Sequence, residues 1–289
     1  MLRKCIVTAI TLAVFITSYT CAFGSNRQVT VTLPSFPVVL NELRFDENSY
    51  EKYPLLVYKD ITYFPMTYYQ ANLLNLNTHW TAEDGLIITR GNPEIPKEFL
   101  YETPISNKNS RTQAATVVDS NVTVNGKVID NKNEPYPLLI FRDITYFPLT
   151  WRFAVEEFGW NYTFDNTAGL IISADNFFYT SNVRTPSAVF AYAGMNDETY
   201  ISGIETHYIK GNLRVFIKTD LNRLGPVGWN LYIVENGVET RPRGWFGYFQ
   251  GKGPLFTVDG NYINTSYYTI PEERNPRPCR VSIETGQII

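Results

Sequence analysis

Cysteine and histidine are scarce in this sequence. Its 289 residues include three cysteines and two histidines, His79 and His207. Only Cys279 lies outside the first 24 residues, so a chain without those residues cannot form an intramolecular disulfide and must be held together by core burial. Two imidazoles alone cannot provide three-nitrogen metal coordination. We therefore expect no metal and no cofactor, and we expect both histidines to be half-exposed strand residues.

Long hydrophobic runs are also lacking, apart from one near the start of the chain. Two basic residues precede an apolar stretch from Ile6 to Ile16, and small residues lead to Gly24. This pattern is typical of a secretory signal peptide, residues 1–24, and predicts an extracellular location. The stretch is too short for a membrane span, which needs ~20 apolar residues. An uncleaved anchor and a lipoprotein with Cys21 lipidated are the alternatives.

Basic residues are too few to favour a nucleic-acid partner. The chain has 25 Lys and Arg against 28 Asp and Glu, a formal charge of −3, and loss of Arg3 and Lys4 with the signal peptide makes it −5 (23 against 28). Binding to phosphate backbones needs clustered Lys and Arg. At 44% hydrophobic and 15% aromatic residues, the chain is globular and long enough for two or three small domains. The composition leaves the oligomeric state open.

Common catalytic motifs are missing as well. The sequence has no Gly-x-Ser-x-Gly elbow, and the glycines from Gly244 to Gly253 are not followed by the helix of a phosphate-binding loop. Glu156 and Glu157 are adjacent on a predicted helix, so they face different directions. Asp60 and Asp143 lie in predicted turns, where Asp bonds its own backbone. These absences predict a protein that is not an enzyme.

What the sequence does contain is a repeated aromatic motif. Residues 53–67 read YPLLVYKDITYFPMT and residues 136–150 read YPLLIFRDITYFPLT, with eleven of fifteen positions identical. The match continues, with one residue of slip, until Gly85–Ile88 pairs with Gly169–Ile172. A match over ~55 residues indicates an internal duplication.

Each repeated unit has a predictable local structure. In the first unit, two strands joined by a turn at Lys59–Asp60 precede a short helix. Thr67 is a suitable N-cap for this helix, and Thr150 is a suitable N-cap for its counterpart. The helix is expected to stop at Asn75 in the first unit and at Gly159 in the second, because both residue types tolerate a left-handed cap. Asn125–Gly126 is a tight hairpin signal. The aromatic residues are expected to fill the interface between sheet and helix.

The order of these elements resembles a known family. A strand turn, the motif DITYFPxT, a short helix, and then Trp80 or Phe164 before GLII are similar to the copper amine oxidase-like N-terminal domain, also called the stalk domain. The resemblance covers residues 29–90 and 120–174. It implies two tandem copies of a module found in bacterial secreted or wall-associated proteins. In the amine oxidases themselves, this module is an appendage remote from the chemistry.

The chemistry of that family is not carried over with the module. Amine oxidases hold copper with three histidines and build a quinone from a tyrosine in an Asn-Tyr-Asp/Glu context. Here Asn161–Tyr162 and Asn261–Tyr262 are followed by Thr163 and Ile263 instead of an acid. The resemblance therefore implies a fold and a location, without copper or quinone catalysis.

The composition changes near residue 185, where helical periodicity gives way to β-rich runs and turns. We expect an α+β fold with two repeated small antiparallel sheets, each wrapped on one short helix, followed by an all-β, sandwich-like domain. The expected segments are the first unit at 25–91, a linker at 92–119, the second unit at 120–180 and the β domain at 185–289.

One stretch of the β domain has conspicuous chemistry. Two aromatic pairs occur between Arg241 and Gly253, and neighbouring strand residues point to opposite sides, so the four rings cannot all face one core. Basic residues flank them, and such a loop could stack on sugar rings or on apolar groups of a partner. A twisted hairpin packed against the second unit is the other interpretation. The candidate ligand-binding residues are Arg241, Arg243, Trp245, Tyr248 and Lys252.

Together these features favour a secreted, non-catalytic bacterial surface protein. In this hypothesis, stalk-like modules present a β domain that binds a cell-wall polymer or a protein partner. The alternative is a secreted enzyme, for example one acting on carbohydrate, with a site between the second unit and the β domain. A cleft with two convergent carboxylates, for instance Glu205, Glu239 or Asp259 with a partner, would indicate that alternative.

Overall fold

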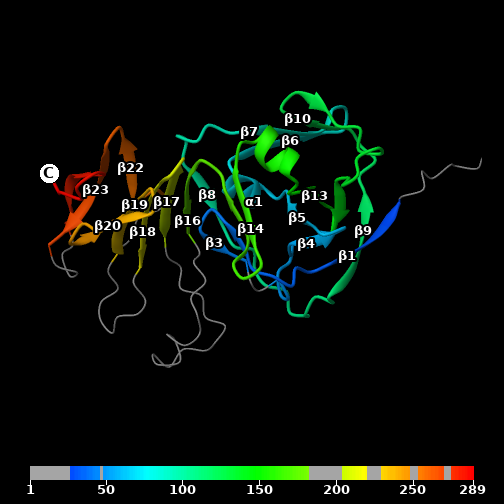
Figure 1. The fold of residues 1–289 in the computed structure, drawn as a ribbon, viewed down its shortest axis with the longest axis horizontal. Helices are drawn as coiled ribbons and strands as arrows, with labels where there is room; N and C mark the ends of the chain where they lie inside the picture. Colours follow the sequence, from blue (N-terminus) through cyan, green and yellow to red (C-terminus); the bar gives the residue numbers. More distant parts are fainter. Residues whose placement is uncertain (1–26, 46–47, 182–203, 220–228, 248–252, 270–274) are drawn as a thin grey trace, which may run out of the picture.

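Strands dominate the computed structural model, which describes residues 27–45, 48–181, 204–219, 229–247, 253–269 and 275–289. Two short helical elements occur in these ranges, α1 (Tyr68–Leu73) and η1 (Arg152–Glu157). The predicted α+β class is therefore wrong, because the described chain is mostly β. Figure 1 shows the strands of the repeated units on one side and the C-terminal strands on the other.

A closed six-stranded barrel joins the two repeated units. Counterpart strands meet in it, because β5 pairs with β13 and β1 pairs with β9, both antiparallel. Each unit also contributes the hairpin of the repeated motif, β4–β5 or β12–β13. In order around the barrel, the strands are β1 (Gln28–Thr32), β4 (Leu56–Tyr58), β5 (Ile61–Pro65), β13 (Ile144–Pro148), β12 (Leu139–Phe141) and β9 (Thr112–Val117).

The two hairpin turns of the barrel have the expected backbone. Lys59 and Asp60 have φ of 50° and 64°, and Arg142 and Asp143 have φ of 51° and 62°. Positive φ at both central residues is the conformation of a type I′ turn, which matches the twist of paired strands. The repeated motif therefore encodes the same hairpin twice.

The two units exchange hairpins outside the barrel. The first unit gives β2 (Val38–Leu40) and β3 (Leu43–Arg44) to the sheet of β14 (Asn161–Asp165) and β15 (Gly169–Ser173). The second unit gives β10 (Val122–Val124) and β11 (Lys127–Val128) to the sheet of β6 (Leu76–Thr81) and β7 (Gly85–Arg90). The strands at each junction are parallel. The expectation that each unit wraps its own sheet on its own helix is wrong, because both sheets contain strands from both units.

Two counterpart glycines permit this exchange. Gly85 and Gly169 have φ of +72° and +78°, and a Cβ atom at either would lie 2.0 Å from a backbone oxygen, that of Asn121 or Pro37. The same oxygens accept hydrogen bonds of 3.0 Å from the N–H of the residue that follows each glycine. Only glycine allows so close an approach at positive φ.

The helix ends follow the sequence signals. Thr67 Oγ1 accepts a hydrogen bond from the N–H of Gln70, and the residues after the helices, Asn75 and Gly159, have φ of 54° and 67°. In the second unit the N–H of Phe153 lies 3.4 Å from Thr150 Oγ1, and the helix is a π-helical turn. The predicted cap at Thr67 and both predicted stops are confirmed, whereas the N-cap position of η1 is Trp151 and not Thr150.

Two more sheets share an apolar core at the C-terminal end. The core includes Val215 and Leu231 from the first sheet and Phe246, Ile263 and Val281 from the second. The first sheet runs in the order β20 (Val238–Thr240), β19 (Trp229–Glu235), β18 (Leu213–Thr219), β17 (Glu205–Lys210), β16 (Asn176–Thr180) and β8 (Lys97–Phe99). The second contains β21 (Trp245–Phe246), β22 (Phe256–Asp259), β23 (Tyr262–Tyr268) and β24 (Arg277–Ser282).

Strands β8 and β16 attach the C-terminal sheets to the repeated units. Residues 92–119, expected to be a linker, contain β8 and the barrel strand β9. Asn176 at the start of β16 is fully buried, and its side-chain amide donates to the carbonyl oxygens of Asn72 and Leu73 in α1, both at 2.8 Å. The C-terminal sheet is therefore built directly on the first unit's helix.

Candidate functional site

The structure describes three of the five predicted ligand-binding residues. Arg241 and Arg243 are exposed, and Trp245 is half-buried at the start of β21. Tyr248 and Lys252 lie outside the described residues. The predicted set can therefore be placed only in part.

Arg241 is engaged within its own sheet. Its guanidinium forms an ion pair with Glu239 and lies 4.4 Å from the centre of the Tyr232 ring. Trp245 and its neighbour Phe246 point to opposite sides, since Phe246 is fully buried in the core between the two sheets. These contacts give Arg241 a role in covering the sheet, and they leave part of the Trp245 ring accessible.

A row of stacked rings crosses the sheet next to Arg241. Phe178, His207, Phe216 and Tyr232 are directly paired across β16, β17, β18 and β19. Successive ring centres lie 4.8, 5.8 and 4.8 Å apart, with interplanar angles of 2°, 17° and 10°. Cross-strand ring pairs of this kind stabilise a sheet. The row indicates a packing role for these residues.

The two histidines occupy different environments on different elements. His79 on β6 is exposed, whereas His207 is only 4% exposed, so the expectation of a half-exposed His207 is wrong. His207 Nε2 lies 3.4 Å from Glu205 Oε2, and Nδ1 has no hydrogen-bond partner among the described residues. Within those same ranges, no group of three or more His, Cys, Asp or Glu side chains is placed to hold a metal ion.

Two of the three carboxylates named above, Glu205 and Glu239, lie far apart in one sheet. Glu205 is on β17 and Glu239 is on β20, three strand spacings away, so their backbones are at least about 14 Å apart at ~4.8 Å per spacing. Asp259 is on β22, in the other sheet. Each carboxylate also lies beside a histidine or arginine nitrogen. Paired carboxylates of glycosidases stand only about 5 to 9.5 Å apart.

The second repeated unit carries an aromatic surface that the sequence analysis missed. Trp151, directly before η1, is 59% exposed, and Phe164 on β14 is 54% exposed. Tyr162 on β14 lies 6.3 Å from Trp151 between ring centres, and Phe36, before β2, lies 5.5 Å from Phe164. Tyr162 and Phe164 share one face of β14 because they are two residues apart. These four residues are named the aromatic strip.

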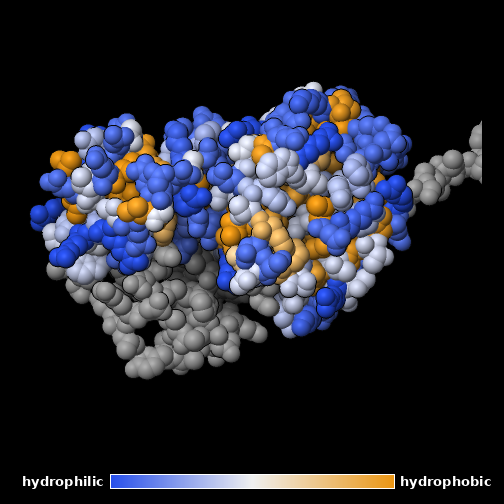
Figure 2. All heavy atoms as spheres, viewed as in Figure 1, coloured by the Kyte–Doolittle hydropathy of each residue, from blue (hydrophilic) through white to orange (hydrophobic). Residues whose placement is uncertain are grey.

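The strip is supported from beneath by the core. Phe36 and Tyr162 pack against the hydrophobic core of the repeated units, and burial raises the pKa of the Tyr162 hydroxyl. Trp151 and Phe164 are the more exposed rings. Figure 2 shows hydrophobic surface in the region of β14 on this face of the molecule. Because two of the four rings are already fixed, a ligand would order few additional side chains.

The two most exposed rings of the strip, Trp151 and Phe164, have aromatic counterparts in the first unit. Tyr68 corresponds to Trp151 and Trp80 corresponds to Phe164, and these residues are 70% and 64% exposed. The expectation that the aromatic residues fill the helix–sheet interface is thus wrong at Trp80 and Phe164. β14 is an edge strand with no fully buried residue, and its sequence carries no signal of that edge position.

The other two rings, Tyr162 and Phe36, have no aromatic counterparts. Thr78 stands in the first unit where Tyr162 stands in the second, and Ser120 stands in place of Phe36. The fold therefore forms around one unit without these rings, which indicates that the complete strip is not a packing requirement. Exposed, contiguous aromatic surface of this kind is typical of interaction sites.

No family model matches the chain, and no curated protein or solved structure matches it either. None of the helices in the described ranges combines the length and apolar character that crossing a membrane requires.

Proposed function

We propose that this chain is a secreted, non-catalytic bacterial surface protein that binds a cell-wall polymer through the aromatic strip. The two repeated units form a stalk-like body, in line with the resemblance to the copper amine oxidase-like N-terminal domain. The sandwich-like C-terminal sheets extend that body. The observation that carries the proposal is the set of four neighbouring rings around β14, where the counterpart surface around β6 has only Tyr68 and Trp80.

The chemistry of the strip favours a polymer of sugars. Sugar rings have apolar faces that stack on aromatic rings, and their hydroxyls remain hydrated at the edges. Four neighbouring rings suit an extended chain with several similar units, since each ring can contact a different unit. The Tyr162 hydroxyl and the Trp151 indole N–H are the polar groups within the strip. A protein partner with exposed apolar side chains is the competing occupant.

The test is co-sedimentation of residues 25–289 with purified bacterial cell walls. The strip variant is Trp151→Ala/Phe164→Ala, and the matched control is Tyr68→Ala/Trp80→Ala, which removes the counterpart rings. Truncation of anchoring aromatic residues commonly costs tenfold or more in affinity. We expect the wild type and the control to sediment, and the strip variant to stay in solution.

Other results would redirect the proposal. Loss of binding in Trp245→Ala alone would place the site at the predicted loop. Equal loss in the strip variant and the control would remove the special role of the second unit. No sedimentation of the wild type would reject a wall polymer and leave a soluble protein partner to be sought. Release of soluble sugar from the walls would reject the non-catalytic assignment.

A further inference from the structure

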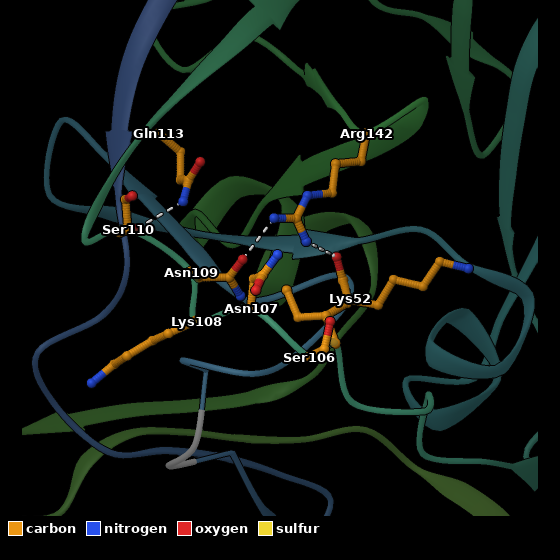
Figure 3. A pocket seen from close by; sticks show the side chains of 9 residues that line it. Lys52, Ser106, Asn107, Lys108, Asn109, Ser110, Gln113 and Arg142 are labelled. Atoms are coloured by element: carbon orange, nitrogen blue, oxygen red, sulfur yellow. Dashed lines mark hydrogen bonds between the residues drawn. The ribbon is translucent and has the colours of Figure 1, made fainter.

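A polar pocket of about 470 Å³ lies beside the barrel turn at Arg142. Residues 105–113 form one wall, and the other side comes from Lys52 and Arg142, which belong to the first and the second unit (Figure 3). Hydrogen-bond donors dominate the lining, and no aspartate or glutamate is part of it. The lining residues are Lys52, Ile105, Ser106, Asn107, Lys108, Asn109, Ser110, Gln113 and Arg142.

Arg142 is held in place without losing its charge. Its Nη1 donates to the carbonyl oxygen of Lys52, and its Nη2 donates to Asn109 Oδ1 at 2.6 Å. The guanidinium carbon lies 4.8 Å from the centre of the Phe141 ring. Both acceptors are neutral, so the positive charge is not compensated by them. A guanidinium has five N–H donors, and three remain for a ligand.

Asn109 makes the pocket rigid. Its side chain is buried, and its Nδ2 donates to the carbonyl oxygens of Asn48 and Glu51 at 3.0 and 2.8 Å. Its backbone N–H donates to the carbonyl oxygen of Ser49 at 2.7 Å. These bonds fix residues 105–113 against the first unit. The wall of the pocket is therefore already formed before any ligand binds.

Two lysines flank this rigid part. Lys52 and Lys108 are exposed, and within the part of the chain that the structure describes neither forms an ion pair with a carboxylate. The Lys52 ammonium lies 5.0 Å from the centre of the Tyr53 ring. Figure 3 shows the two amino groups on opposite sides of the pocket, pointing outward. Their flexible stems allow both ammonium groups to turn toward an anion.

A comparison of the two repeated units shows which pocket residues the fold requires and which it does not. In the first unit, Lys59 stands in the place of Arg142 and donates to the carbonyl oxygen of Pro135 at 3.1 Å. Pro135 is the counterpart of Lys52, so the contact between turn and carbonyl occurs twice. The fold therefore explains a cation at residue 142. It does not explain a lysine at residue 52, where the equivalent position is proline.

We propose that this pocket is an anion-binding site that takes a phosphate group. A fixed guanidinium, two mobile ammonium groups and the hydroxyls of Ser106 and Ser110 suit an oxyanion with several acceptor oxygens. The chain as a whole is negative, so the site is a local concentration of positive charge. The phosphate could belong to a small molecule or to a phosphodiester polymer. The site is separate from the aromatic strip and does not depend on the function proposed for the strip.

Calorimetric titration of residues 25–289 tests this site with three probes: inorganic phosphate, glycerol phosphate and a poly(glycerol phosphate) chain. The variants are Lys52→Ala, Lys108→Ala and Arg142→Gln, with thermal melts to confirm folding. Lys59→Ala is the matched control, because it removes one charge at the counterpart of Arg142. We expect about fivefold weaker binding for each lysine removed, unchanged binding in the control, and weaker binding at high salt.

The outcomes are distinct. Equal affinity per phosphate for all three probes would assign the site to small phosphates, whereas tight binding of the polymer alone would assign it to a phosphodiester chain. No binding of any probe at millimolar concentration would overturn the proposal. An equal loss in Lys59→Ala would overturn it too, because only net charge would then matter. The Trp151→Ala/Phe164→Ala variant should bind phosphate normally, which separates this site from the proposed function.

Discussion

Phe64 of β5 lies directly opposite Phe147 of β13, and each is the counterpart of the other in the duplication. Both side chains are 1% exposed. On either side of this pair, Tyr63 faces Pro148 and Pro65 faces Tyr146, which are the same two residue types in reverse order. The two units are therefore related by an approximate twofold axis through this pair, and they form one body in which neither unit is closed by itself.

A pair of counterpart asparagines predicts unequal losses of stability. Asn41 is fully buried, donates from Nδ2 to the Leu73 carbonyl at 2.6 Å and accepts from the Ala174 N–H at 2.7 Å. Asn125 makes the same two kinds of bond but is half-exposed. Asn41→Ala should cost about 2 kcal/mol, because the buried Ala174 N–H loses its partner, whereas the Leu73 carbonyl keeps the bond that it accepts from Asn176. Asn125→Ala should cost about 1 kcal/mol, because water can replace the side chain. Urea unfolding measures both losses, and equal values would contradict the argument.

The hairpin exchange predicts that two glycines cannot be replaced. Gly85→Ala or Gly169→Ala would put a methyl group 2.0 Å from a backbone oxygen at positive φ. We expect a loss of at least ~3 kcal/mol or failure to fold. Gly126→Ala is the control, because its φ is +79° but nothing lies within 4 Å of the added carbon. It should cost only about 1 to 2 kcal/mol. Circular dichroism melts compare the three variants, and similar melting temperatures would be evidence against the close approach.

The interior of the barrel predicts that two tyrosine hydroxyls are dispensable. Tyr63 and Tyr146 are counterparts, both are fully buried, and neither hydroxyl has a hydrogen-bond partner among the described residues. Tyr63→Phe and Tyr146→Phe should each leave stability unchanged or raise it by about 1 kcal/mol, because each removes an unsatisfied polar group. Tyr58→Phe, at a half-buried position, is the control and should be neutral. A clear loss in urea unfolding would instead indicate a water bound inside the barrel.

The same two tyrosines predict a loss of stability at high pH. Burial raises the pKa of both hydroxyls well above the ordinary value of 10.0. The folded state then keeps two protons that the unfolded state releases, so their contribution is present below pH 10.0 and is lost as the pH rises above it. Unfolding free energy measured from pH 8 to about pH 11 should fall more steeply in the wild type than in the double Phe variant. Parallel curves would show that other groups cause the fall.

The junction between the two parts of the molecule predicts that residues 185–289 do not fold alone. That fragment lacks β8 and β16, so β17 would lose its neighbour and expose an unpaired edge. It would also lose Phe177, which belongs to the core between the two C-terminal sheets. Size-exclusion chromatography should show aggregation of 185–289. A fragment of residues 92–289 is not a suitable control, because it lacks the barrel strands β1, β4 and β5. The reference is therefore the whole chain from residue 25. A monomeric, well-folded fragment would contradict the prediction.

The sequence determined the local features of this protein. The duplication is visible in the sequence itself. The turns at Lys59–Asp60 and Asn125–Gly126, the cap at Thr67 and the stop at Asn75 follow from backbone preferences within a few residues. Such preferences act equally in a fragment and in the whole chain, because they depend on φ, ψ and nearby side chains. That is why they could be predicted without knowing which strands meet.

The tertiary structure alone decided which strands pair and which faces are covered. Asn125–Gly126 predicted a hairpin, but this signal carried no information that the first strand of the hairpin, β10, lies parallel to β7 in the other unit. For the same reason, local patterns did not predict the edge position of Phe164, the burial of His207 or the approach of residues 105–113 to Arg142. Each depends on partners distant in sequence, and a hydrophobic strand can be buried equally well by several such partners. The closure of the barrel and the shape of the exchanged hairpins select one of them.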